Sequence, residues 1–345
     1  LENMRAGDAH GPERKFNVEV AFESDGSVRS MKMRALDNAG AYAGRAPFQL
    51  GKPISAIVGP YQINSVSYHA ISVTSNKTVQ EAVRGFGQAP TNYAIETAMD
   101  RVASFLKMDR LALRQRNLIR REQFPYLIPS GSTYDSGDYH AVIEKVLTAA
   151  DYPTLLAKRD HLRDAGMMAG IGIAACLEPS GGNSSFEPLL NESNKTSTWM
   201  ESCQINVDGL GNLTARIHTT SSGQGHETLV STVLGEVLEI DPSSIRITRP
   251  NSLESLPGNS PVGSRMAIML GGAAARSAEK LKAKLIKIGA HSLGIDAEKL
   301  TYAGGNVLAP DGRKHTWQDA VELAHRQFHN LPEGMDPGLA AFDIM

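Results

Sequence analysis

The sequence predicts an α+β protein in which sheets and helices are mixed along one chain. Several stretches alternate apolar and polar residues, as half-buried strands do. Others repeat apolar residues every three or four positions, which is typical of amphipathic helices, and turns rich in Gly, Pro, Asn and Ser separate the two kinds of stretch. A chain of 345 residues is long enough to bury one large core or two smaller ones.

Two strands near the start of the chain are expected to form a hairpin. Phe16 to Phe22 and Ser27 to Ala35 both alternate, and the turn-forming Glu23 to Gly26 lies between them. The alternation returns from Ser65 to Thr74, whereas repeated Gly and Pro from Gly44 to Pro60 argue against a regular element there. The sequence therefore predicts a hairpin, a long loop and a third strand.

Helices are predicted after this third strand. Apolar residues recur at helical spacing from Asn92 to Leu106, directly after the glycine-rich stretch from Arg84 to Gln88. A second amphipathic segment runs from Asp109 to Asn117. Residues 125–137 are rich in Pro, Ser and Gly and predict a loop, and His140 to Ala150 again has a helical pattern.

The second half of the chain has the same mixed character. Gly170 to Leu177 is a short apolar run that predicts a strand. Ser202 to Val207 and Leu213 to Thr219 flank an Asp-Gly turn and predict a second hairpin. Helical periodicity follows in Thr228 to Leu238 and, after a glycine pair, in Ala273 to Gly289.

Composition excludes several classes of protein. A formal net charge of -2 gives no field that would concentrate nucleic acid or anionic lipid, so small molecules are the expected partners. No apolar stretch approaches the roughly 20 residues of a membrane span, and we expect a cytoplasmic protein. Two cysteines, Cys176 and Cys203, are too few for a disulfide scaffold or for a four-cysteine zinc or iron-sulfur site.

Three glycine-rich segments are candidates for ligand binding. They are Arg84 to Gln88, Gly223 to His226, and Gly258 to Arg265, which includes Ser260. Glycine lets a backbone approach a ligand and point N–H groups at anionic oxygen, especially where a helix begins. Each segment alone is also compatible with an ordinary helix-opening turn, so none of them identifies a function by itself.

Together and in this order, the three segments resemble the molybdenum-cofactor-binding large subunit of the xanthine dehydrogenase and aldehyde oxidase family, which includes carbon monoxide dehydrogenase. Asp37 to Tyr42 and Glu81 to Gln88 add to the likeness, which covers nearly the whole chain. The resemblance implies the mixed sheets and helices of the molybdenum-cofactor-binding domains of molybdenum hydroxylases. It also implies a first molybdenum-cofactor-binding region at 1–165, which carries the substrate loop, and a second at 166–345, which lacks its C-terminal part. A further segment of the subunit is expected before residue 1.

The resemblance assigns a substrate site to three residues. The loop that contains Arg84 would pass beside the metal, and Phe86 would lie against a flat substrate, for which a phenyl face is suited. Lys52 would supply a cation for polar atoms of the substrate. The alternatives are a core phenylalanine, a surface arginine and a solvated lysine.

The cofactor, a molybdenum-bound pterin, would contact all three glycine-rich segments. An amide side chain both donates and accepts, as a pterin edge requires, and a hydroxyl with a guanidinium suits the phosphate end of the cofactor. The implied contacts are Gly85, Gly87, Gly223, Gln224, Gly225, Gly263, Ser264 and Arg265. Whether the cofactor is the cytosine dinucleotide form is left open. His226 is assigned no metal role, and no metal-ligating side chain is predicted.

The implied reaction is oxidative hydroxylation of an aldehyde or N-heterocycle with water as the oxygen source. The catalytic residue is unknown, because the family's Gly-Glu motif lies near the C-terminal end and the pair Gly235-Glu236 falls inside a predicted helix. Electrons would leave through an iron-sulfur subunit and, as an open alternative, a flavin subunit that binds FAD. Further molybdenum-cofactor-binding segments are implied as partners.

Two other functions stay open. One is a non-catalytic scaffold subunit that holds the cofactor but lacks a base. The other is the large subunit of carbon monoxide dehydrogenase, whose active loop carries a copper-holding cysteine where this chain has Gly85. Because a soft metal needs a thiolate or a comparable ligand, glycine at this position argues against copper chemistry.

Overall fold

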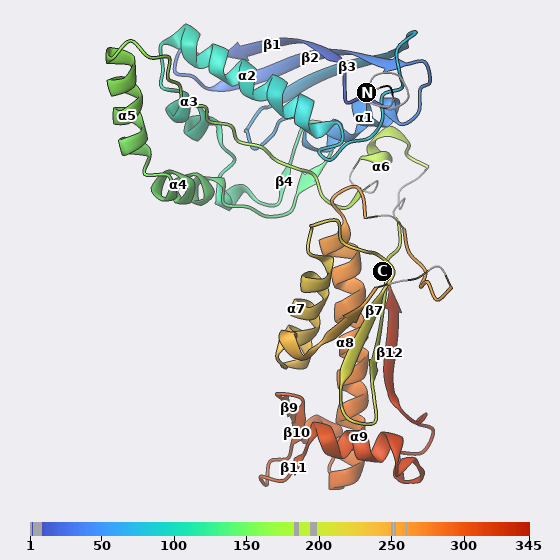
Figure 1. Cartoon of the computed structure of the whole chain (residues 1–345). Coiled ribbons are helices and arrows are strands. Elements are labelled where there is room, and N and C mark those ends of the chain that lie inside the picture. Colours follow the sequence, from blue (N-terminus) through green and yellow to red (C-terminus); the bar gives the residue numbers. More distant parts are fainter. Residues whose placement is uncertain are drawn as a thin grey trace. The chain divides into compact units, whose positions relative to one another are not determined.

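The computed structural model describes residue 2 and residues 9–182, 186–193, 199–249, 251, 253–259 and 261–345. Ser260, in the third glycine-rich segment, lies outside the described residues. Two compact units are present (Figure 1). The first extends to Pro179 and includes residues 186–193, and the second consists of residues 180–182 and of the chain from residue 199 onward.

The first unit contains a three-stranded sheet in the order β1–β2–β3. β1 (Arg14–Phe22) and β2 (Val28–Gly40) are antiparallel, with Phe16 opposite Ala35, so the predicted hairpin is confirmed. β3 (Ser65–Thr74) has the bounds of the predicted third strand and runs parallel to β2. A parallel pair needs a crossover connection, and residues 41–64 supply it.

The prediction of a loop from Gly44 to Pro60 is wrong. α1 (Ala46–Gly51) and a 3-10 helix (Lys52–Ala56) occupy this region. Pro47 and Pro53 lie at the first or second position of these helices. A proline there leaves no hydrogen bond unmade, so it is compatible with the start of a helix although it breaks a helix farther along.

Helix α2 (Gln88–Leu106) lies across one face of the sheet (Figure 1). Its buried side chains Ile95 and Met99 belong to the same core as Met31 and Met33 of β2. The predicted helix is confirmed, and it begins four residues earlier than its apolar pattern. This earlier start places the glycine-rich turn directly at the N-terminus of α2.

The remaining elements of the first unit surround this core. α3 (Arg110–Asn117) begins at Asp109, whose carboxylate accepts a hydrogen bond from the Ala112 N–H. Two helices follow. α4 (Tyr139–Ala149) confirms the predicted helix, whereas the pattern did not predict α5 (Tyr152–Asp164). The short elements are a 3-10 turn (Arg121–Gln123), β4 (Tyr126–Leu127), β5 (Thr133–Tyr134) and α6 (Glu187–Leu190).

The second unit contains a four-stranded sheet in the order β12–β6–β7–β8. β6 (Ser202–Val207) and β7 (Leu213–Ile217) are antiparallel, which confirms the second predicted hairpin. β8 (Arg246–Thr248) lies parallel to β7, and β12 (Leu339–Ile344) lies antiparallel to β6. Smaller elements are β9 (Thr301–Ala303), β10 (Asn306–Leu308), β11 (Lys314–His315), α9 (Trp317–His325) and 3-10 turns at Pro242–Ser244, Ala297–Lys299 and Phe328–Asn330.

Two helices, α7 (His226–Leu238) and α8 (Met266–Leu293), pack side by side in this unit (Figure 1). A methyl group at Gly271 would lie 3.9 Å from Leu229 Cδ1, near the start of both helices. Farther along, Lys282 Nζ donates to the Val237 carbonyl over 3.4 Å. The two helices therefore run parallel, and their N-termini lie at the same end of the unit.

The predicted start of α8 after a glycine pair is wrong, because Gly271 and Gly272 lie inside the helix. A Cβ atom at Gly272 would lie only 2.0 Å from Met345 Sδ. Glycine inside a helix is unfavourable by about 1 kcal/mol relative to alanine, but here it lets a neighbouring side chain approach closely. Periodicity alone could not distinguish this use of glycine from a helix boundary.

Candidate functional site

The loop from Arg84 to Gly87 lies against the end of α1 in the first unit. Gly87 has a φ of 71°, and a Cβ atom there would lie 2.1 Å from the Gln49 carbonyl oxygen. Only glycine therefore fits at this position. Phe86 is half-buried and Arg84 is exposed, so the loop presents both side chains outside the apolar core.

Lys52 follows α1 directly and lies three residues after Gln49. Its side chain is 2% exposed, and its ammonium nitrogen lies 2.7 Å from Glu178 Oε1, whose side chain is 40% exposed. The alternative of a solvated lysine is wrong. Since Gln49 contacts Gly87, the structure brings Lys52 and the Arg84–Gly87 loop to the same end of α1.

A cavity of about 470 Å³ opens beside this loop. Gly85, Cys176 and Glu178 are among the residues that line it. Tyr93 of α2 also borders it, with a side chain that is largely exposed. A cavity with mostly apolar walls and a few charged groups is the usual form of a small-molecule site.

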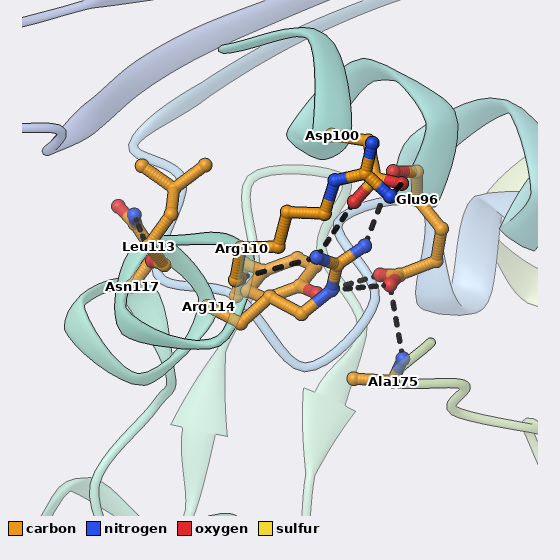
Figure 2. A network of polar contacts seen from close by, with 8 residues as sticks. Glu96, Asp100, Arg110, Leu113, Arg114, Asn117 and Ala175 are labelled. Atoms are coloured by element: carbon orange, nitrogen blue, oxygen red, sulfur yellow. Dashed lines mark hydrogen bonds and ion pairs between the residues drawn. The ribbon is translucent and has the colours of Figure 1, made fainter. Parts of the chain in front are cut away.

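A buried polar network forms one wall of this cavity, and Glu96 lies at its centre (Figure 2). The Tyr61 hydroxyl donates to Glu96 Oε1 over 2.6 Å, and Arg114 Nε donates to Glu96 Oε2 over 2.8 Å. The backbone N–H of Ala175 donates to the same Oε2 over 3.0 Å. Arg114 also pairs with Asp100 over 2.9 Å, so its buried charge is fully compensated.

The network changes the pKa values of Tyr61 and Arg114. Burial raises the pKa of Tyr61, and the adjacent Glu96 carboxylate raises it further, so the hydroxyl stays a donor. Burial lowers the pKa of Arg114, but attraction to Glu96 outweighs this effect and raises the pKa overall. Burial, followed by the charge of Glu96, raises the pKa of the Cys176 thiol. A neutral thiol therefore faces the cavity at neutral pH.

In the second unit, the Gly223–Gly225 turn opens α7. Gly223 and Gly225 have φ values of 99° and 74°, and nothing lies within 4 Å of a Cβ built at Gly223. Gln224 is exposed, with its side-chain oxygen bonded inside the turn and its amide nitrogen without a partner among the described residues. Among the described residues no side-chain hydrogen bond caps this helix, whose first N–H groups have no partner within the helix.

The Gly263–Arg265 turn opens α8 at the same end of the unit. The Gly182 N–H donates to the Gly263 carbonyl over 2.9 Å, and Ser264 has a left-handed φ of 54°. Arg265 is buried, donates to the Trp199 carbonyl, and forms an ion pair with Glu201 over 2.6 Å. The two predicted cofactor turns thus lie at the same end of the second unit, while the Arg265 guanidinium has an internal partner.

Reasoning from the sequence missed Glu96 and Arg114. Both are charged residues in amphipathic helices, where exposure is the usual outcome. One signal was present: Glu96 and Asp100 are four residues apart and therefore lie on one face of α2. Nothing in the sequence indicates that Arg114 of the next helix lies opposite this face.

Comparison with known proteins identifies the family. Two models described as a molybdopterin cofactor-binding domain match residues 1–118 and 145–341, and the second match covers more than half of the chain. The chain belongs to the molybdopterin cofactor-binding domain family. This result confirms the resemblance and the predicted fold class.

Among relatives of this molybdopterin cofactor-binding chain, the nicotine 6-hydroxylase large subunit of Paenarthrobacter nicotinovorans is 28% identical over 98% of the chain and 41% of its own length. The carbon monoxide dehydrogenase large chain of Hydrogenophaga pseudoflava is 31% identical over 94% of this chain and 40% of its own length. Carbon monoxide dehydrogenase from Oligotropha carboxidovorans matches in structure with a TM-score of 0.86 and 27% identity, over 99% of this chain and 43% of that one. Quinoline 2-oxidoreductase from Pseudomonas putida 86 also matches in structure, with a TM-score of 0.86 and 25% identity, over 99% of this chain and 44% of that one.

The chain spans about two fifths of the length of these curated relatives. The relatives are oxidoreductases of the molybdenum hydroxylase family, and several are large subunits of complexes. None of the helices in the described part of the chain combines the length and the apolar character needed to cross a bilayer.

The second unit contains groups that fit a molybdopterin. His226 begins α7, is 5% exposed, and has no partner for its Nδ1 atom among the described residues. Beside it, the open space at Gly223 and the amide of Gln224 supply room and a donor for a pterin or phosphate edge. The fit rests on α7 more than on Arg265, whose guanidinium is bound to Glu201.

Proposed function

We propose that this chain is part of the large subunit of a molybdenum hydroxylase that oxidatively hydroxylates an aldehyde or N-heterocycle with water as the oxygen source. The observation that carries the proposal is that Gly85, next to Phe86 in the Arg84–Gly87 loop, and Glu178, the ion-pair partner of Lys52, line one cavity. A flat ring binds there between an aromatic face and a cation that polarises its carbonyl or ring nitrogen.

The residues of the chain have separate tasks in this proposal. Phe86 orients the ring of the substrate, Lys52 donates to a polar atom of the substrate, and Glu178 holds the Lys52 ammonium in place. The turns that contain Gln224 and Gly263 bind the pterin and its phosphate end. The bound molybdenum-pterin group supplies the redox chemistry, and a partner iron-sulfur subunit carries the electrons away, with a flavin subunit as the open alternative for the next step.

We further propose that residues 1–165 and 166–345 are the two cofactor-binding regions and that the complex is cytoplasmic. The form of the pterin cofactor is left open. The general base lies outside this chain. The Gly235-Glu236 pair is inside α7, as predicted, where Gly235 is buried and Glu236 is exposed. General-base catalysis typically contributes about 10²- to 10⁴-fold, so the chain alone retains little activity.

The experiment compares the cofactor-loaded chain with the assembled complex, using an artificial electron acceptor so that missing redox partners do not limit turnover. We expect hydroxylation of flat aldehydes or N-heterocycles by the complex and very little by the chain alone. Equal rates would show that the chain contains its own base, with Glu178 and Glu81 as the residues to test. No turnover by the complex would contradict the proposed function.

Carbon monoxide dehydrogenase is the second candidate, favoured by 31% identity to one such large chain. Cys176 lines the same cavity as Gly85 and is the exposed one of the two thiols. Copper analysis of the complex decides between the candidates, because stoichiometric copper with oxidation of carbon monoxide would favour the second.

A further inference from the structure

Glu96 joins three separate parts of the first unit through one carboxylate. Its Oε1 accepts from Tyr61, and its Oε2 accepts from Arg114 of α3 and from the backbone of Ala175. The side chain is 8% exposed, and that of Arg114 is 0% exposed. A buried carboxylate that accepts three hydrogen bonds has a fixed orientation. It can therefore hold the backbone of Ala175 in place.

The segment that donates to Glu96 is extended but belongs to no sheet ladder among the described residues. Positions alternate between half-buried and exposed from Ala169 to Glu178, as in a strand. The bond from Ala175 to Glu96 is the only hydrogen bond that a backbone N–H of residues 170–177 makes within the described part of the chain. Ala175 and Leu177 also pack against the core, so Glu96 supplies the one backbone hydrogen bond of this segment in addition to apolar packing.

The same segment carries the residues that face the cavity. Cys176 and Glu178 lie on its exposed side and line the cavity together with Gly85 of the substrate loop. Glu178 is three residues beyond Ala175, about 10 Å along an extended chain, and pairs with Lys52. A shift of the segment at Ala175 would reach the Lys52 contact.

We propose that Glu96, held by Arg114, is a positioning residue that fixes the segment from Ala175 to Glu178 and, through it, the Glu178–Lys52 pair of the substrate site. The inference rests on the proposed function for the role of that pair toward substrate. Glu96 itself touches neither the substrate loop nor Lys52 in the described contacts, so it acts through the segment.

The first test needs no turnover. Mass spectrometry measures three rates in Glu96→Gln and Glu96→Ala. They are hydrogen exchange of residues 170–178, thiol labelling of Cys176 and acylation of Lys52. The labelling rate at high pH, where the thiol is fully ionised, reports access rather than charge. Buried Cys203 does not compete. We expect all three rates to rise several-fold in Glu96→Ala and less in Glu96→Gln, whose amide oxygen still accepts from Ala175.

Asp37→Asn is the matched control for this test. Asp37 forms a buried ion pair with Arg14 over 2.9 Å in the same unit, but it bonds to no residue of the 170–178 segment. It therefore reports the general effect of breaking a buried pair. Equal rates in the Glu96 variants and in Asp37→Asn would overturn the inference, and Glu96→Gln keeps the test valid if Glu96→Ala does not fold.

The second test is a double-mutant cycle on the assembled enzyme with Glu96→Gln and Glu178→Gln. We expect each variant to raise KM several-fold with a smaller change in kcat, and the double variant to resemble Glu178→Gln alone. Additive effects on KM would overturn the positioning role. Absence of turnover in the unaltered complex would instead count against the proposed function and would leave the exchange and labelling results to decide the role of Glu96.

Discussion

Lys52 and Glu178 form an ion pair of unequal burial, with 2.7 Å between Nζ and Oε1 and side chains that are 2% and 40% exposed. Water can solvate the glutamate after loss of its partner, but it cannot reach the ammonium group as easily. The two ends of the pair therefore differ in what their removal does to the protein.

We expect Glu178→Gln to lower the free energy of unfolding by about 1–3 kcal/mol, because a buried ammonium loses its counter-charge. Lys52→Met should change it by less than about 1 kcal/mol, because the carboxylate left behind is partly solvated. Chemical denaturation of both variants checks this order. Equal losses, or a larger loss for Lys52→Met, would mean that the lysine contributes mainly through packing of its stem.

Phe86→Ala should weaken turnover of flat aromatic substrates more than it weakens folding. Ring stacking contributes about 0.5–1.5 kcal/mol, whereas loss of a core phenylalanine lowers stability by about 3–5 kcal/mol. Phe86 is half-buried and is not a member of the buried core cluster. Phe105→Ala, at an aromatic side chain on α2 that is 78% exposed, is the control. Severe unfolding without a selective kinetic effect would favour the core-residue alternative.

Gly87→Ala should destabilise the first unit more than Gly131→Ala does. Both glycines have a positive φ, which disfavours a side chain by about 1–2 kcal/mol. A Cβ at Gly87 would also lie 2.1 Å from the Gln49 carbonyl oxygen, whereas at Gly131 the nearest atom is Leu189 Cδ2 at 3.5 Å. The difference between the free energies of unfolding of the two variants, measured by urea denaturation, isolates the backbone clash. Similar losses would show that the loop moves freely away from α1.

The rate of Cys176 labelling should have its inflection at a higher pH than that of a free thiol, whose pKa is about 8.5. The folded-state pKa is raised by burial and then by the charge of Glu96, so less thiolate is present at a given pH. Glu96→Gln removes the negative charge and should move the inflection to lower pH. The unfolded chain supplies the reference profile. An inflection unchanged by this substitution would mean that burial alone sets the pKa.

Arg265→Met should lower the free energy of unfolding by about 3–5 kcal/mol, because it leaves Glu201 buried without a counter-charge. Adding Glu201→Leu should recover part of this loss, since neither charge then remains in the core. Thermal unfolding of the single and double variants checks the expectation. A double variant less stable than Arg265→Met would indicate that Glu201 has other tasks, such as its bond to the Asn259 N–H.

Local patterns predicted most regular elements but not their boundaries. The two hairpins and the helices from Asn92 and His140 were found because alternation and helical spacing record which face of an element is buried. The sequence does not predict α1, because proline breaks most helices and no local pattern shows that Pro47 lies in a first turn. Substrate and cofactor roles for the predicted site residues stay predictions.

The sequence by itself determined the α+β character, the glycine turns that open α2 and α7, and the family that the three glycine-rich segments resemble. Only the tertiary structure decided which charges meet. Glu96 and Ala175 are 79 residues apart, Lys52 and Glu178 are 126 apart, and Glu201 and Arg265 are 64 apart. Backbone periodicity is a local property, whereas a buried charge takes its partner from any element that the fold brings within hydrogen-bond distance.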